Sequence, residues 1–196
     1  MSMDIIEIQR HLKKKQSEHR FTHSLGVQYT SICLAMKYCY DLSKAELAGI
    51  LHDCAKHYSA EKLIKACEKN KIPITDSERK SPFLLHAKVG ALLAADKYGV
   101  TDNEVLDAIR CHTTGKPAMT MLEKIVFVAD YIEPGRNNAP NLDTLRQLSF
   151  ENIDEAVLAI LQQTLDYLKG KKQDIDQHTV ETYNYYKHLL GREDDE

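Results

Sequence analysis

A histidine and an aspartate stand side by side at positions 52 and 53, inside the apolar stretch LAGILHDCAK of residues 47–56. The stretch has the composition of a buried helix. A carboxylate in such surroundings is costly unless a cation meets it. Imidazole and carboxylate groups are both metal ligands, so a metal ion is the economical candidate for that cation, with a purely structural role for the pair as the alternative.

Four further residues of the same two kinds recur along the chain. His23 lies early in a long predicted helix, and His86, His112 and Asp130 lie at the apolar ends of predicted helices. Asp130 ends the run IVFVAD and has no cationic neighbour in the sequence, so it too requires a counter-charge. Four imidazoles and two carboxylates suit a first-row transition metal such as iron or manganese better than magnesium, which prefers oxygen ligands. Asp53 is the candidate to bridge two ions. Paired ions activate a water molecule and hold a phosphoryl oxygen.

Cationic and hydroxyl side chains lie near these ligands in the sequence. Arg20 precedes His23 by one helical turn, and Lys56 follows Asp53 by the same interval. Each cation alone is typical of a solvated surface, but the whole set favours a polyphosphate site because arginine grips phosphate with two donors and lysine acts as a point charge. The predicted substrate-binding residues are Arg20, Lys56, Lys88, Thr113, Thr114 and Arg136. His19, four residues before His23, competes with it for the same ligand position.

The elements that position these residues are predicted to be helices, with strand signals nearly absent. Residues 150–169 carry apolar side chains at the helical period. Capping-box patterns begin at Ser43, Thr101 and Thr120. Pro82 suits a helix start and Gly99 a helix end. We expect helices at 4–15, 18–39, 44–56, 60–70, 82–98, 102–112, 121–132, 142–148, 150–169 and 178–190, with loops at 71–81 and 133–141.

Composition limits the class of protein. The 196 residues predict one all-α domain, with its core in 17–135 and C-terminal helices 142–190 packed on it. A net charge of −3 without a basic stripe argues against bulk nucleic-acid binding. No apolar run approaches the ~20 residues of a membrane span, and no signal peptide is evident. Five cysteines without CxxC spacing predict no disulfide framework and favour the cytoplasm.

The order His23, His52-Asp53, Asp130 resembles the HD-domain superfamily of metal-dependent phosphohydrolases over residues 17–135. His86 and His112 match those members that hold two metals. More narrowly, the chain resembles the YqeK family, which hydrolyses diadenosine tetraphosphate symmetrically to two ADP. The stretches that carry this likeness are RFTHS at 20–24, LHDCAK at 51–56, HAKVGA at 86–91, HTTG at 112–115, ADYIEPGR at 129–136 and TVETYNYY at 179–186.

The resemblance implies a compact multi-helix bundle with the metal site at its centre. It implies two divalent or trivalent transition-metal ions per chain, with iron expected and manganese as the alternative. The first ion would be held by His23, His52, Asp53 and Asp130, and the second by Asp53, His86 and His112. Asp53 and Lys56 are the predicted catalytic residues, and a water activated by the ions is the predicted nucleophile.

Several alternatives to this function remain. Another HD-type reaction could act on guanosine tetraphosphate or a nucleoside phosphate, or the chain could be a nucleotide-binding sensor without turnover. A helical scaffold with coincidental histidines is the plainest alternative. The absence of a Gly-x-x-x-x-Gly-Lys-[Ser/Thr] loop argues against a P-loop NTPase. The tyrosines at 183, 185 and 186, in an apolar-faced segment, favour a homodimer.

Overall fold

The computed structural model describes residues 3–192, and within them the chain forms eleven α-helices, one short 3-10 helix (η1) and no strand. The predicted all-α fold class is confirmed. No helix in this part of the chain has the length and apolar character needed to cross a membrane. The elements are α1 (Ile5–Lys15), α2 (Glu18–Lys37), α3 (Leu42–Leu51), α4 (Ala60–Lys69), α5 (Asp76–Lys80), η1 (Pro82–Leu85), α6 (His86–Tyr98), α7 (Asn103–Cys111), α8 (Met121–Ile132), α9 (Leu142–Glu151), α10 (Ile153–Gly170) and α11 (Gln177–Leu189).

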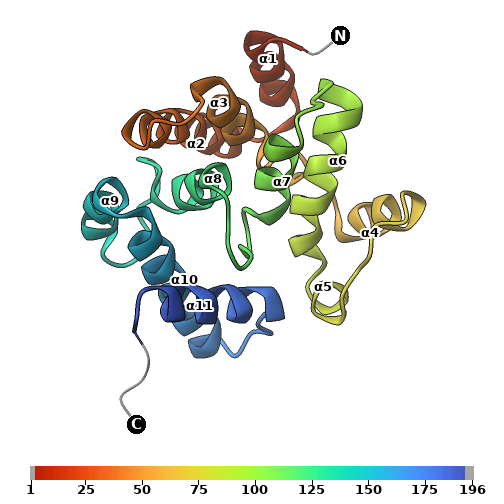
Figure 1. Ribbon diagram of the computed structural model, residues 1–196. Coiled ribbons are helices and arrows are strands. Elements are labelled where there is room, and N and C mark those ends of the chain that lie inside the picture. Colours follow the sequence, from red (N-terminus) through yellow and green to blue (C-terminus); the bar gives the residue numbers. More distant parts are fainter. Residues whose placement is uncertain (1–2, 193–196) are drawn as a thin grey trace.

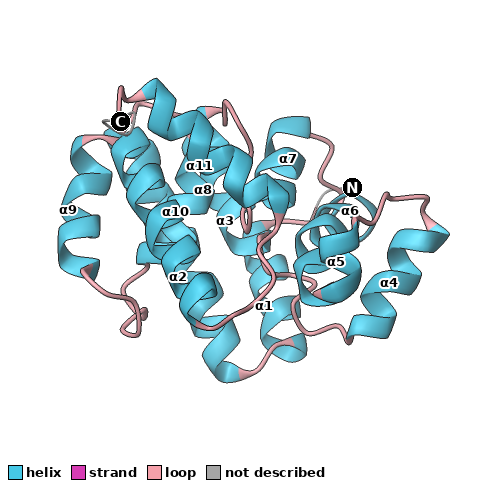
Figure 2. Cartoon of the chain, turned by 90° about the horizontal axis from the view of Figure 1, so that it is seen from below, coloured by secondary structure: helices cyan, strands magenta, loops and turns pink. Residues whose placement is uncertain are grey.

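Four helices, α2, α3, α7 and α8, form the centre of the bundle (Figure 1). Helix α2 packs against α3 and α8, while α7 packs against α3, α6 and α8. Helices α4 and α5 lie at one edge, beyond α6, and α9 to α11 lie at the opposite side, as the view from below also shows (Figure 2). The residues that could carry chemistry come from the central helices and α6.

The hydrophobic core runs through the central helices and into α10. Leu34, Ile50, Ile109 and Ile125 are fully buried there, one from each central helix. The predicted apolar face of the 150–169 helix is confirmed for Ile153, Val157, Ile160, Leu161 and Leu165, which are among the seven residues that α10 buries, whereas Leu168 is only half-buried. A smaller cluster joins α4 to η1 and α6 and consists of Ala55, Leu63, Cys67, Leu85 and Val89.

Helix ends test the capping predictions. The capping box of Thr120 with Glu123 is present at the start of α8, and Gly99 ends α6 in the left-handed conformation with φ of 71°. The other two predicted caps are wrong. Asp41 caps α3 and Asp102 caps α7 instead, and each carboxylate accepts a backbone N–H of the first turn. Helix α3 begins at Leu42, which places Ser43 inside the helix, and α7 begins at Asn103, which places Thr101 one residue before the cap.

Two helix boundaries differ from expectation in ways that matter for the site. The predicted helix 44–56 ends at Leu51, and the chain continues in successive turns in which Cys54, Lys56 and Tyr58 each bond back three residues. The pair His52-Asp53 therefore lies at the first of these turns. The predicted 71–81 loop contains helix α5, whose five residues are too few to show a hydrophobic period, and η1 precedes α6 within the predicted 82–98 helix.

Candidate metal centre

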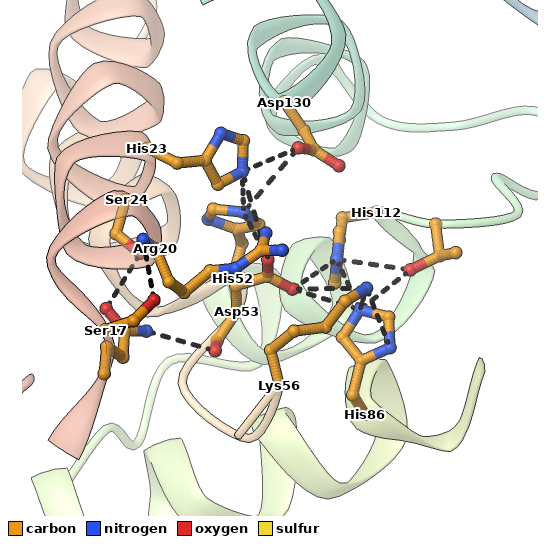
Figure 3. A network of polar contacts seen from close by, with 12 residues as sticks. Ser17, Arg20, His23, Ser24, His52, Asp53, Lys56, His86, His112 and Asp130 are labelled. Carbon is orange, nitrogen blue, oxygen red and sulfur yellow. Dashed lines mark hydrogen bonds and ion pairs between the residues drawn. The ribbon is translucent and has the colours of Figure 1, made fainter. Parts of the chain in front are cut away.

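The six predicted metal ligands converge at the centre of the bundle (Figure 3). They come from five separate segments of the chain. The contributing residues are His23 from α2, His52 and Asp53 from the turn after α3, His86 from the first position of α6, His112 from the end of α7 and Asp130 from α8. The histidines and Asp53 are at most 6% exposed, and the Asp130 side chain is 21% exposed.

Asp53 lies between two pairs of histidines, with one carboxylate oxygen facing each pair. Its Oδ1 is 3.1 Å from His86 Nε2 and 3.6 Å from His112 Nε2. Its Oδ2 is 3.6 Å from His52 Nε2 and 3.9 Å from His23 Nε2. A carboxylate in this position could offer one oxygen to a cation on each side.

The histidines of each pair approach each other through their Nε2 atoms. These atoms are 3.3 Å apart in His23 and His52, and 3.1 Å apart in His86 and His112. Asp130 Oδ1 lies 3.1 Å from His23 Nε2, on the far side of the first pair from Asp53. Two sets of ligand atoms are compact enough for one ion each: His23, His52 and Asp130, and His52, Asp53 and His112, with all atoms of a set within 4.8 Å of one another.

The other ring nitrogen fixes the tautomer of three histidines. In His52, His86 and His112 the Nδ1 atom donates to the carbonyl oxygen of the residue three positions earlier, at 2.7 Å for His52 and 2.8 Å for His112. A carbonyl can only accept, so the proton of the neutral ring is on Nδ1. The lone pair is then on Nε2 and points into the site, as metal ligation requires.

The Nδ1 of His23 faces a side-chain carboxylate instead of a backbone carbonyl. Its Nδ1 lies 3.1 Å from Oε1 of Glu133, the buried residue that directly follows α8. Sequence reasoning missed Glu133 as a site residue because it is 110 positions away from His23 and opens a stretch that reads as a Pro-Gly loop.

Burial and mutual charge set the protonation of these groups. Burial lowers the pKa of His52 to about 4 and also lowers that of His86, so both rings are neutral at pH 7. Burial acts against ionisation of Asp53 and Asp130, but neighbouring imidazoles outweigh it and hold both carboxyl pKa values below the usual range. Burial also disfavours protonation of His23, yet the hydrogen bond to Asp130 raises its pKa overall.

The centre therefore brings together lone pairs and negative charge. The buried Asp53 Oδ1 has no hydrogen-bond partner of good geometry among the described residues. Paired Nε2 lone pairs at hydrogen-bond distance repel each other unless a proton or a cation lies between them. A nitrogen and oxygen ligand set of this kind fits a first-row transition metal.

Four of the predicted phosphate partners border the centre. Arg20 Nη1 is 2.7 Å from Asp53 Oδ2, and Arg136 Nη2 is 2.9 Å from Asp130 Oδ1. The Lys56 ammonium lies 3.1 Å from His86 Nε2. The Thr113 hydroxyl lies 3.3 Å from the same nitrogen and 3.2 Å from His112 Nε2.

The remaining candidates lie outside the cluster. Lys88 Nζ is 2.7 Å from the buried Glu78 carboxylate and 2.9 Å from the carbonyl oxygen of Pro73, so it ties the 71–81 segment to α6. The Thr114 hydroxyl donates to the carbonyl oxygen of Gly115. His19 is exposed and lines a cavity of about 340 Å³ beside His23, rather than joining the ligands.

The chain is similar to a known protein family and to named bacterial proteins. Residues 20–135 match the HD domain family. The chain is 40% identical over 174 residues to "Bis(5'-nucleosyl)-tetraphosphatase, symmetrical" of Bacillus subtilis, covering 89% of this chain and 92% of that protein. It is 37% identical over 188 residues to the protein of the same name from Staphylococcus aureus, covering 95% and 96%.

A solved structure is similar along the whole chain. It is a predicted HD superfamily hydrolase involved in NAD metabolism from Clostridium acetobutylicum, 37% identical, with a TM-score of 0.93 over 98% of this chain and 100% of that one.

Proposed function

The chain belongs to the HD domain family, and from that premise we propose that it hydrolyses diadenosine tetraphosphate symmetrically to two molecules of ADP. It is an HD phosphohydrolase, a hydrolase acting on acid anhydrides. Relatives that bear the symmetrical tetraphosphatase name match it over nearly its full length. The expected ligands are the nucleoside polyphosphate substrate and the nucleoside diphosphate product.

Two transition-metal ions per chain are part of this proposal, with iron expected and manganese as the alternative. His23, His52, Asp53 and Asp130 would hold one ion, and Asp53, His86 and His112 the other. When bound, such a pair supplies a water nucleophile at neutral pH and polarises a phosphoryl oxygen. The observation that carries the proposal is the position of the buried Asp53 carboxylate. One of its oxygens lies 3.1 Å from His86 Nε2 and the other lies 3.6 Å from His52 Nε2.

We assign the binding of a polyphosphate to cationic side chains at the rim of the centre. Arg20, Lys56 and Arg136 present cations at the rim of the centre, with side chains that are 31%, 31% and 43% exposed. A polyphosphate that enters there meets guanidinium groups able to donate two hydrogen bonds each and an ammonium beside the second histidine pair. These groups stabilise the negative charge that develops on phosphate oxygens during cleavage.

Thr113, Thr114 and Lys88 were also predicted to bind substrate. The Thr113 hydroxyl, next to His86 and His112, supports this role for Thr113. The Lys88 ammonium donates to the Glu78 carboxylate and to the carbonyl oxygen of Pro73, so its contacts do not support a role in binding phosphate. A homodimer and a cytoplasmic location remain proposals from the sequence, based on the C-terminal tyrosines and on cysteine usage.

Product analysis tests the proposed reaction directly. The full chain, loaded with iron(II) or manganese(II), is incubated with diadenosine tetraphosphate and the products are separated by ion exchange. ADP as the sole nucleotide product supports symmetrical cleavage, whereas AMP together with ATP contradicts it. Turnover of guanosine tetraphosphate or a nucleoside phosphate alone favours another HD reaction, and nucleotide binding without turnover favours a sensor.

A further inference from the structure

Glu133 lies against the Nδ1 edge of His23, opposite the Nε2 edge that faces Asp130. Its side chain is 4% exposed. One carboxylate oxygen, Oε1, lies 3.1 Å from His23 Nδ1, and the other, Oε2, accepts the backbone N–H of Gly135 at 2.6 Å. Both oxygens are thus engaged by donors, and the carboxylate is held in one orientation against the imidazole.

The two contacts require a carboxylate in this place. Both partners, His23 Nδ1 and Gly135 N, are donors when His23 carries its proton on Nδ1. A carboxylate offers two acceptor oxygens and satisfies both. A glutamine of the same size has one acceptor oxygen and one NH₂ group, so one of its two contacts would set donor against donor.

Two glycines leave the space that the Glu133 carboxylate fills. A Cβ on Gly26, one turn along α2 from His23, would lie 2.3 Å from Glu133 Oε2. A Cβ on Gly135 would lie 2.9 Å from the same oxygen. Gly26 in α2 and Gly135 in the loop after α8 therefore both leave room for the Glu133 carboxylate, although the two segments are more than one hundred residues apart.

We propose that Glu133 is a positioning residue that fixes the orientation and tautomer of His23 and thereby strengthens metal binding. His52, His86 and His112 are oriented by neutral carbonyl oxygens, whereas His23 is oriented by a charged group. A carboxylate behind an imidazole makes its other nitrogen a stronger ligand, and loss of such a partner typically costs metal affinity. The inference rests on the metal centre of the proposed function, but not on its substrate.

Manganese affinity of the metal-free full chain, measured by calorimetric titration, tests the proposal. E133Q should bind Mn²⁺ about 10- to 100-fold more weakly than the unmodified chain. The matched control is E123Q, at the start of helix α8, the helix that Glu133 directly follows. Glu123 is 1% exposed and is held by Lys116 and the backbone N–H of Thr120, far from His23 in its contacts. E123Q should keep the original affinity.

G26A provides a second variant that leaves Glu133 itself intact. The added methyl group must push the carboxylate aside, while alanine suits the helix interior better than glycine. Mn²⁺ affinity should fall in G26A as it does in E133Q. This variant keeps the proposal testable if E133Q does not fold.

Cobalt(II) supplies a spectroscopic signature that a general loss of stability would not produce. In the cobalt-loaded chain, the exchangeable Nδ1 protons of ligating histidines give paramagnetically shifted NMR signals. E133Q should displace one of these signals and leave the others in place, and E123Q should displace none.

Unchanged Mn²⁺ affinity in both E133Q and G26A would overturn the role of Glu133, as would equal losses in E133Q and E123Q. A chain that binds Mn²⁺ normally but does not cleave diadenosine tetraphosphate would contradict the proposed reaction and leave the assignment of Glu133 standing on its affinity data.

Discussion

Arg20 Nη1 lies 2.7 Å from Asp53 Oδ2, so a side chain that is 31% exposed reaches a carboxylate that is 3% exposed. The guanidinium connects the buried centre with solvent. Only one of its five N–H donors is needed for this ion pair. We therefore expect its other donors to bind a phosphate that arrives from outside.

Arg20→Gln should lower kcat/KM for diadenosine tetraphosphate by about 100-fold, because charge-assisted contacts to phosphate oxygens strengthen as cleavage proceeds. Steady-state kinetics at saturating metal measures the effect. The exposed Arg79 on α5 is the control, and its replacement by Gln should leave kcat/KM unchanged. Equal activity of the two variants would remove Arg20 from the substrate site.

Asp53→Asn should abolish both metal binding and turnover while leaving a folded helical chain. Asparagine keeps the shape but offers one neutral acceptor oxygen, so it can neither bridge two ions nor balance their charge. Metal content after dialysis, circular dichroism and turnover are measured on one preparation. Full activity in this variant would refute the proposed bridging role.

Lys88, which lies outside the centre, and Lys56, which lies at its rim, should separate stability from activity. Lys88→Met leaves the buried Glu78 without its cation and should destabilise the fold by about 2 kcal/mol, which corresponds to a Tm lower by roughly 4–8 °C. Its kcat/KM should stay near that of the unmodified chain. Lys56→Met should show the reverse, a loss of activity with little change in Tm. Thermal melts and kinetics on both variants decide the matter.

Much of the fold could be predicted from the sequence because its signals are local. The Thr120 capping box and the apolar period of α10 each lie within a few turns of the chain. Helix α5 was missed because five residues cannot display a period. The cap of α3 was misplaced because Asp41 and Ser43 are both residue types that cap helices. Helix α3 begins at Leu42, so Asp41 is the residue that caps it.

The candidate site also contains residues that local sequence signals identify and residues that they do not. Five of the six ligand candidates could be found because each is a polar side chain in an apolar setting, which is visible in a short window. His23 was found because its order relative to His52-Asp53 and Asp130 resembles the HD-domain superfamily. Glu133 could not, since its role depends on His23 in a distant helix and its own neighbours are Pro134 and Gly135. The partner of Lys88 could not be predicted from the sequence either. Its pairing with Glu78 depends on how the 71–81 segment folds back against α6.

Metal removal should lower the thermal stability of the chain, because an ion that binds only the folded state stabilises it by mass action. At a free metal concentration 100 times the dissociation constant the gain is about 2.7 kcal/mol, or roughly 5–10 °C in Tm for a chain of this size. Thermal melts are recorded before and after dialysis against a chelator, and again after iron(II) or manganese(II) is restored. Asp53→Asn is the matched control and should melt at one temperature throughout. A chain whose Tm does not respond to chelation or to added metal would contradict a metal centre built on these six residues.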